Sequence, residues 1–177
     1  MIYYLAGGSK SGKSMLAQRI VRAMPGPHYY VATMRPQDAE DDARIEKHLA
    51  DRVGWGFLTA EQPENICALL DTCDRGGAFL LDSVTALLTN EMFRADGAVD
   101  LDAAARVEQE LLNLAKRVSN IVIVSDLIFS DGVRYDTLTE TFRAGLGRIG
   151  CALAEIADGV AEVSAGVPIW YKGGWGE

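Results

Sequence analysis

The stretch that most constrains this chain is residues 7–14, Gly-Gly-Ser-Lys-Ser-Gly-Lys-Ser, which fits the pattern G-x-x-x-x-G-K-[ST] without a mismatch. A short apolar run at 2–5 precedes it, and a helix-forming run at 14–23 follows it. In such a strand, loop and helix arrangement, the loop's backbone N–H groups converge on one anion, and the positive end of the helix adds to the attraction. The stretch therefore predicts a phosphate-binding loop. The alternative is an ordinary glycine- and serine-rich turn.

Individual residues of this loop have separate roles in the prediction. Gly7 and Gly12 allow backbone angles that a Cβ atom would penalise. Lys13 is expected to reach the β- and γ-phosphates of a nucleotide, and the Ser14 hydroxyl is expected to hold Mg²⁺. The predicted nucleotide contacts in the loop are Gly7, Gly8, Ser9, Lys10, Ser11, Gly12, Lys13 and Ser14.

The composition suits one nucleotide-binding domain, residues 1–177, with a full hydrophobic core. The net charge is −8 and no basic cluster is longer than Lys116-Arg117, so a nucleic-acid partner is not expected. No apolar run approaches the roughly 18–20 residues that span a bilayer. The strand and loop that begin the chain also leave no room for a secretory layout. We therefore expect a cytoplasmic protein without a membrane segment.

Apolar runs and helix-forming runs alternate along most of the chain. This alternation predicts an α/β fold with a mostly parallel sheet and helices on both of its faces. The turn at Ala165-Gly166 is so short that the last two strands are expected to form an antiparallel hairpin. Strands are expected at 2–5, 28–33, 55–58, 78–82, 120–125, 159–163 and 167–172. Helices are expected at 14–23, 38–51, 64–73, 102–118 and 137–157, and a helix or a turn at 83–93.

Asp82 is a second candidate site residue, because it ends the apolar run at 78–82. A central parallel strand delivers its last residue to the ligand edge of the sheet, where a carboxylate beside the phosphate loop holds Mg²⁺ directly or through water. Taken alone, an aspartate in this position is more often a helix cap or a turn former. His48 lies in a charged segment and, taken alone, is an exposed surface histidine.

Five blocks of sequence, taken together in their order, resemble one known family. They are residues 7–14, Tyr-Val-Ala-Thr at 30–33, Arg44-Ile45 with His48 and Arg52, Thr59-Ala-Glu61, and Leu-Leu-Asp82 followed by Leu88-Thr89-Asn90. A weaker sixth block runs from Phe142-Arg143 to Pro168. The chain resembles the bifunctional adenosylcobinamide kinases/adenosylcobinamide-phosphate guanylyltransferases of cobalamin biosynthesis over nearly its whole length.

The resemblance implies a RecA-like P-loop fold, a homotrimer, and ATP or GTP with Mg²⁺. It implies phosphorylation of the aminopropanol hydroxyl of adenosylcobinamide, followed by GMP transfer from GTP to give adenosylcobinamide-GDP. His48 matches the histidine that carries GMP covalently in the family. Further nucleotide contacts are implied at Ala32, Thr33, Met34, Leu49, Ala50, Asp51, Arg52, Glu61 and Asp82.

Two other functions remain open on the sequence. Where the family commonly has Asn-Glu after the Val-Ser of its fifth strand, this chain has Asp126-Leu127. Such departures in the C-terminal half favour a P-loop kinase for another small alcohol. A phosphate loop alone shows binding and not turnover, so a nucleotide-switched binding protein without catalysis is the third hypothesis.

Overall fold

The computed structural model describes residues 1–35, 54–129 and 131–176. The helix expected at 38–51 therefore lies outside the described residues. The elements in chain order are β1 (Ile2–Gly7), α1 (Lys13–Arg22), β2 (His28–Ala32), β3 (Phe57–Glu61), the 3-10 helix η1 (Ile66–Ala68), α3 (Leu69–Thr72), β4 (Ala78–Asp82), α4 (Val84–Met92), α5 (Ala103–Arg117), β5 (Asn120–Asp126), α6 (Thr137–Ile156), β6 (Gly159–Ser164) and β7 (Val167–Lys172).

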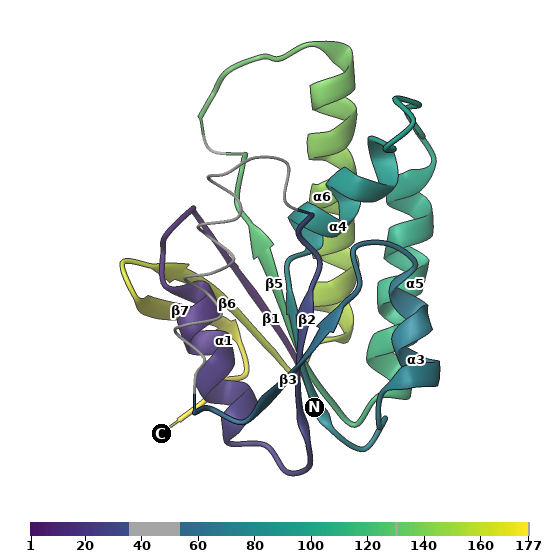
Figure 1. Cartoon of the computed structure of the whole chain (residues 1–177). Coiled ribbons are helices and arrows are strands. Elements are labelled where there is room, and N and C mark those ends of the chain that lie inside the picture. The colour runs from purple at the N-terminus through teal and green to yellow at the C-terminus, as the bar shows by residue number, and fades with distance from the viewer. Residues whose placement is uncertain (36–53, 130, 177) are drawn as a thin grey trace.

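The described strands form one seven-stranded sheet in the order β3-β2-β4-β5-β1-β6-β7 (Figure 1). Every pair is parallel except β6 with β7, which is antiparallel. The expected mostly parallel α/β sheet with a C-terminal antiparallel strand is therefore confirmed. Because β5 lies between β1 and β4, one strand separates β1, which leads into the phosphate loop, from β4, which ends in Asp82.

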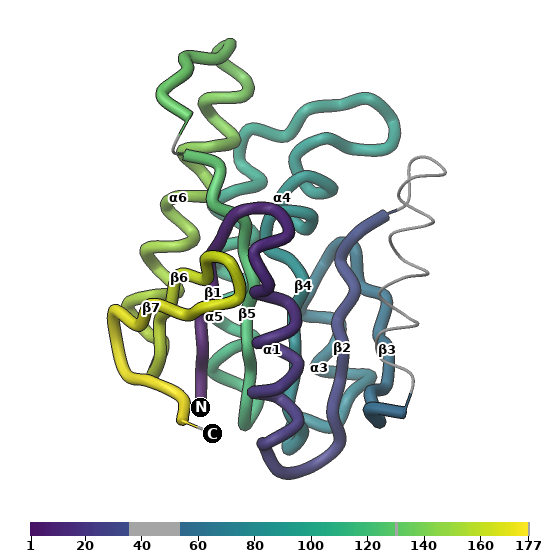
Figure 2. Tube along the Cα trace, turned by 90° about the vertical axis from the view of Figure 1, so that its left-hand side faces the viewer, coloured from purple at the N-terminus to yellow at the C-terminus, as the bar shows by residue number. Residues whose placement is uncertain are grey.

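Helices cover both faces of the sheet, as the alternation predicted (Figures 1 and 2). The helix α1 lies on one face, where Leu16, Ile20 and Val21 pack in one core cluster with side chains of β1, β4 and β5. The helices α4, α5 and α6 lie on the other face and share the second core cluster, in which Leu111 and Ile149 are fully buried. The strand β5 is buried on both faces, as a run without polar alternation requires.

Two elements differ from the sequence expectation. The helix expected at 64–73 is a short 3-10 turn followed by the four-residue helix α3, because Asn65 adopts a left-handed conformation with φ of 47° and delays helical geometry. The strand expected at 55–58 is β3, which begins at Phe57, because Gly56 has φ of 75° and breaks the extended backbone before it. None of the helices within the described stretches is long and apolar enough to cross a bilayer.

The helix α6 is continuous over 20 residues although it contains three glycines. Two of them are sites of close approach. A Cβ atom added to Gly145 would lie 2.6 Å from the Cβ of Ala104 on α5, and one added to Gly150 would lie 2.8 Å from the hydroxyl of Tyr4 on β1. These glycines let α6 pack directly against its neighbours, which outweighs their low helix propensity.

We expect Gly145→Ala to lower the free energy of unfolding by about 1–3 kcal/mol, because the new Cβ would meet a methyl group that cannot rotate away. Gly147→Ala is the matched control, since its Cβ would only touch the ring of Phe129 at 3.7 Å. Removing that glycine should stabilise the helix by about 0.5–1 kcal/mol. Urea denaturation measures both variants. Equal stabilities would contradict the close packing of α5 and α6 at Gly145.

Candidate active site

The phosphate-loop sequence connects β1 to α1 in the geometry that the motif requires. The strand ends at Gly7 and the helix begins at Lys13, with Gly12 at the cap position in a left-handed conformation of φ 93°. The carbonyl of Gly12 accepts the first helical bond from the backbone N–H of Leu16 at 3.1 Å. A side chain at Gly12 would be strained in this conformation, so the loop reaches the helix only with glycine there.

The base of the loop is tightly packed. A Cβ atom on Gly7 would lie 2.5 Å from the carbonyl oxygen of Val163 on β6. The carbonyl of Ser11 accepts a hydrogen bond of 2.8 Å from the backbone N–H of Gly166 in the β6–β7 turn. The hairpin therefore supports the loop from one side, while Gly8, Ser9 and Lys10 remain exposed.

The sheet places the predicted site residues along one edge. Ala32 is in register with both Glu61 of β3 and Asp82 of β4, so these three residues lie side by side where parallel strands end. On the other side of β4, Gly7 is in register with Asp126, the last residue of β5. The phosphate loop, Asp82 and Glu61 thus share the carboxyl edge of the sheet, where the sequence placed Asp82 beside the loop.

Asp126 is a site residue whose contact with Lys13 the sequence analysis missed. The Lys13 ammonium lies 2.7 Å from Asp126 Oδ1 and donates to the Gly8 carbonyl at 3.0 Å. The Lys13 side chain is only 9% exposed, against 27% for Asp126. The backbone N–H of Asp126 donates to the Thr85 hydroxyl at 2.9 Å, which fixes the end of β5 against α4. The sequence signal that could have identified Asp126 is an aspartate at the end of a buried strand, the same signal that identified Asp82.

Asp82 is oriented by a second residue that sequence reasoning missed, the buried Tyr30 of β2. The Tyr30 hydroxyl donates to Asp82 Oδ2 at 3.0 Å. The carboxylate itself is partly exposed, and so is Ser14 at the start of α1. No group of three or more His, Cys, Asp or Glu side chains suited to a metal occurs in the described part of the chain. One carboxylate and one hydroxyl match the oxygen ligands that Mg²⁺ takes when nucleotide phosphates complete its coordination.

Thr33, a predicted nucleotide contact, is fully buried and uses its hydroxyl inside the protein. That hydroxyl donates to the Ser83 carbonyl at 2.8 Å and accepts from the Ser83 backbone N–H at 2.7 Å. The buried Asn90 amide donates to the carbonyls of Thr33 and Pro63 at 2.7 and 3.0 Å. Through its bonds with Ser83, Thr33 links the segment that follows β2 to the segment that follows β4. Its neighbour Met34 is partly exposed at the same edge of the sheet.

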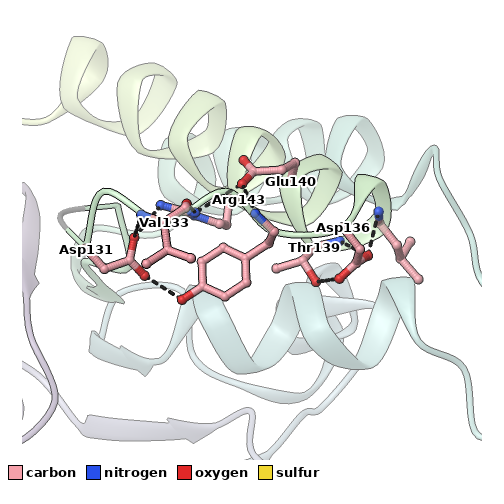
Figure 3. A network of polar contacts seen from close by, with 8 residues as sticks. Asp131, Val133, Asp136, Thr139, Glu140 and Arg143 are labelled. Carbon is pink, nitrogen blue, oxygen red and sulfur yellow. Dashed lines mark hydrogen bonds and ion pairs between the residues drawn. The ribbon is translucent and has the colours of Figure 1, made fainter.

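A charged network orders the segment between β5 and α6 (Figure 3). The Arg143 guanidinium contacts the carboxylates of Asp131 at 3.3 Å and Glu140 at 3.2 Å, and it lies over the Tyr135 ring. The Tyr135 hydroxyl donates to Asp131 at 2.6 Å. This bond is the main reason why the pKa of Asp131 is lowered and the pKa of Tyr135 is raised. A hollow of about 540 Å³ adjoins the network, lined by Val133, Arg134, Tyr135, Thr137, Glu140 and Arg143.

Asp136 begins α6 as its N-cap. Its carboxylate accepts hydrogen bonds from the backbone N–H groups of Leu138 and Thr139 and from the Thr139 hydroxyl. The pKa of Asp136 is lowered, mainly because its carboxylate accepts a hydrogen bond from the Thr139 hydroxyl and, to a smaller extent, because it accepts one from the Thr139 backbone N–H. The helix start is therefore held by a charged cap, as the side-chain type favours.

Five predicted site residues fall outside the described stretches: His48, Leu49, Ala50, Asp51 and Arg52. Their roles stay predictions. Of the described neighbours on either side, Arg35 follows the carboxyl end of β2 at Ala32, and Gly54 precedes the amino end of β3 at Phe57. The described arrangement is a loop with the phosphate-binding sequence, in which Lys10 is exposed and Lys13 is buried, flanked by the carboxylates of Asp82 and Asp126 at the ends of neighbouring strands.

Comparison with known proteins identifies the family. The family described as cobinamide kinase / cobinamide phosphate guanyltransferase matches residues 3–170. The chain belongs to this family. The match includes the phosphate loop, Asp82 and Asp126, and it ends within β7. The resemblance drawn from the six sequence blocks is therefore confirmed.

Two relatives carry names in keeping with the cobinamide kinase family. The chain is 30% identical over 170 residues to the bifunctional adenosylcobalamin biosynthesis protein CobP of Pseudomonas aeruginosa, covering 96% of both chains. It is 29% identical over 184 residues to the bifunctional adenosylcobalamin biosynthesis protein CobU of Salmonella typhimurium, covering 97% of this chain and 100% of that protein. These relatives span essentially the same length as this chain.

The fold is also found in a solved structure of an ATPase domain. That domain superposes with a TM-score of 0.54 at 12% identity, covering 91% of this chain and 68% of that chain. At this identity the likeness concerns the fold alone. It confirms the RecA-like P-loop architecture that the cobinamide kinase resemblance implied.

Thr33 provides a test of how this family member holds its site edge together. We expect Thr33→Val to lower the free energy of unfolding by about 1–3 kcal/mol, because it leaves the Ser83 N–H without its partner and the Ser83 carbonyl with only its bond from the Leu87 N–H. Thr33→Ser keeps the hydroxyl and should cost about half as much. Thermal unfolding compares them. If the valine variant were the more stable of the two, the Thr33–Ser83 bonds would not support the edge.

Proposed function

We propose that this protein phosphorylates adenosylcobinamide and then converts the product to adenosylcobinamide-GDP. The observation that carries the proposal is that Lys13 and Asp82 lie at one edge of the sheet, within a chain that belongs to the cobinamide kinase family. The phosphate loop supplies the anion site, and α1 points its positive end into it. The oxygen ligands Ser14 and Asp82 suit the magnesium ion that accompanies a nucleotide.

In the first reaction, the aminopropanol hydroxyl oxygen of adenosylcobinamide forms a bond to the γ-phosphorus of ATP or GTP. The bond between that phosphorus and the β–γ bridging oxygen breaks, the nucleoside diphosphate leaves, and the hydroxyl proton is released. Phosphoryl transfer asks the protein chiefly for alignment and charge neutralisation. The loop N–H groups align the phosphates, and Lys13 neutralises charge on them.

Magnesium would be held by Ser14 and Asp82, with Tyr30 fixing the orientation of the Asp82 carboxylate. Bound there with the nucleotide, the ion supplies further charge neutralisation on the phosphates and makes pyrophosphate a better leaving group. Tyr30 is buried on β2, so it holds Asp82 in place before any ligand arrives. This preorganisation is what an electrostatic site requires.

In the second reaction, His48 would attack the α-phosphorus of GTP. A P–N bond forms, the bond to the β-phosphate oxygen breaks, and pyrophosphate leaves. The phosphate oxygen of adenosylcobinamide phosphate then attacks the same phosphorus, which releases the histidine and gives adenosylcobinamide-GDP. A neutral imidazole is a competent nucleophile near pH 7. The proposal also places Leu49, Ala50, Asp51, Arg52 and Glu61 at the nucleotide.

The proposal extends to the state of the protein in the cell. We place it in the cytoplasm, as a single catalytic domain that assembles as a homotrimer. Its acidic charge of −8 fits a partner that is a small molecule rather than a nucleic acid. Sedimentation equilibrium tests the trimer.

We expect Lys13→Met to reduce the rate of adenosylcobinamide phosphorylation by about 10²–10³-fold, because the phosphates lose their positive partner. Transfer from γ-labelled GTP measures this rate. Lys116→Met, an exposed lysine near the end of α5, removes the same charge at the opposite edge of the sheet and should leave the rate unchanged. A Lys13→Met enzyme with near wild-type rate would refute the kinase site.

With α-labelled GTP, we expect label to stay on the protein through an acid-labile, base-stable linkage, and to disappear in His48→Ala. His28→Ala is the matched control, because His28 is the other of the chain's two histidines. It starts β2, at the opposite end of that strand from Ala32, and its Nε2 pairs with the Met24 carbonyl at 2.9 Å. Absence of any adduct on the wild-type protein would remove the transferase and leave the kinase standing.

A further inference from the structure

Lys13 carries the charge that the phosphate loop offers to a nucleotide, and the structure shows that this charge is already paired. Its ammonium lies 2.7 Å from Asp126 Oδ1 and 3.0 Å from the Gly8 carbonyl oxygen. An ammonium has three N–H donors, and two of them are used by these oxygens. The Lys13 side chain is 9% exposed and the Asp126 side chain 27% exposed, so the pair is only partly screened by water.

Asp126 cannot easily move away from this position. It is in register with Gly7 at the end of β5, and the next backbone N–H, that of Leu127, donates to the Gly7 carbonyl at 3.0 Å. Its own N–H is held by the Thr85 hydroxyl. The backbone of Asp126 is therefore tied to both β1 and α4, which keeps its carboxylate within reach of the phosphate loop.

We propose that Asp126 is a positioning residue for Lys13 that makes nucleotide binding depend on a divalent cation. In the empty site, Asp126 holds the buried ammonium and neutralises it. When the phosphates of a nucleotide enter, the same carboxylate lies close to them and opposes their negative charge. A cation bound with the phosphates offsets this repulsion, so Asp126 couples the affinity for nucleotide to the affinity for metal.

The charges around the site strengthen this argument. Asp82 ends the neighbouring strand β4, so two carboxylates flank the anion site. The chain as a whole has a net charge of −8 and adds no general attraction for an anion. Among the described residues, the other attractive groups at the loop are its N–H groups and the start of α1, which carry partial charges, and the exposed Lys10, whose charge is screened by solvent. A metal-free nucleotide therefore meets a site whose buried lysine, Lys13, is already neutralised by Asp126.

The inference rests on the proposed nucleotide site but needs no corrinoid for its test. Titration calorimetry with a non-hydrolysable GTP analogue gives the dissociation constant in excess Mg²⁺ and in EDTA. The ratio of the two constants measures the coupling between metal and nucleotide. For Asp126→Asn, which keeps the side-chain shape, we expect metal-free binding to tighten about tenfold and the ratio to fall by about the same factor.

Asp131→Asn is the matched control, because it removes the same charge from the segment that follows β5. The Asp131 carboxylate pairs with Arg143 and Tyr135 rather than with Lys13. Its ratio should equal that of the wild type. Unfolding curves of both variants show whether the fold is retained.

The outcomes separate this inference from the proposed function. An unchanged ratio in Asp126→Asn, with normal wild-type binding in Mg²⁺, would overturn the role of Asp126 and leave the nucleotide site intact. Weaker binding of Asp126→Asn in Mg²⁺ would also overturn it, since Asp126 would then be a metal ligand. A wild-type protein that binds no nucleotide in Mg²⁺ would overturn both proposals.

Discussion

The parallel pairing of β4, β5 and β1 at the centre of the sheet is the constraint on which the site depends. The registers Gly7–Asp126 and Asp82–Val124 bring the phosphate loop and two carboxylates to one edge. Parallel strands with helices on both faces are buried, which explains why the middle of β5, residues 121–124, is apolar. The polar chemistry is thereby confined to the strand ends, where water and a nucleotide have access.

Because the charged groups are gathered at the strand ends, each of them needs a partner, which a side chain from a neighbouring element supplies. The buried Lys13 ammonium is paired with Asp126, and the Asp82 carboxylate is oriented by Tyr30. The backbone carbonyl of Thr33, just beyond the end of β2, is also paired, because the Asn90 side-chain amide donates a hydrogen bond to it. A site built this way is preorganised before ligand binds, which is the property that electrostatic catalysis requires. Binding of an anion and a cation then changes the net charge of this site.

Much of the fold could be predicted because its signals are local. The strand at 78–82 and the start of α6 at Thr137 match the sequence expectation, and α1 differs by one residue at each end. Where prediction failed, a single backbone conformation intervened, as at Asn65, whose left-handed geometry delays the helix expected from residue 64. Propensity describes averages over a window, so it does not register one residue that departs from them.

The phosphate loop, the sheet type and the position of Asp82 at a strand end could be read from the amino-acid sequence, because each is encoded in a contiguous run whose period or motif has a direct physical meaning. The place of β5 between β1 and β4 is known only from the folded chain. That position of β5 sets Asp126 against Lys13, and the pairing of β2 with β4 sets Tyr30 against Asp82; in both cases the two residues are far apart in the chain. Strand order follows from how the helices and strands pack together, and no single segment of the sequence specifies it.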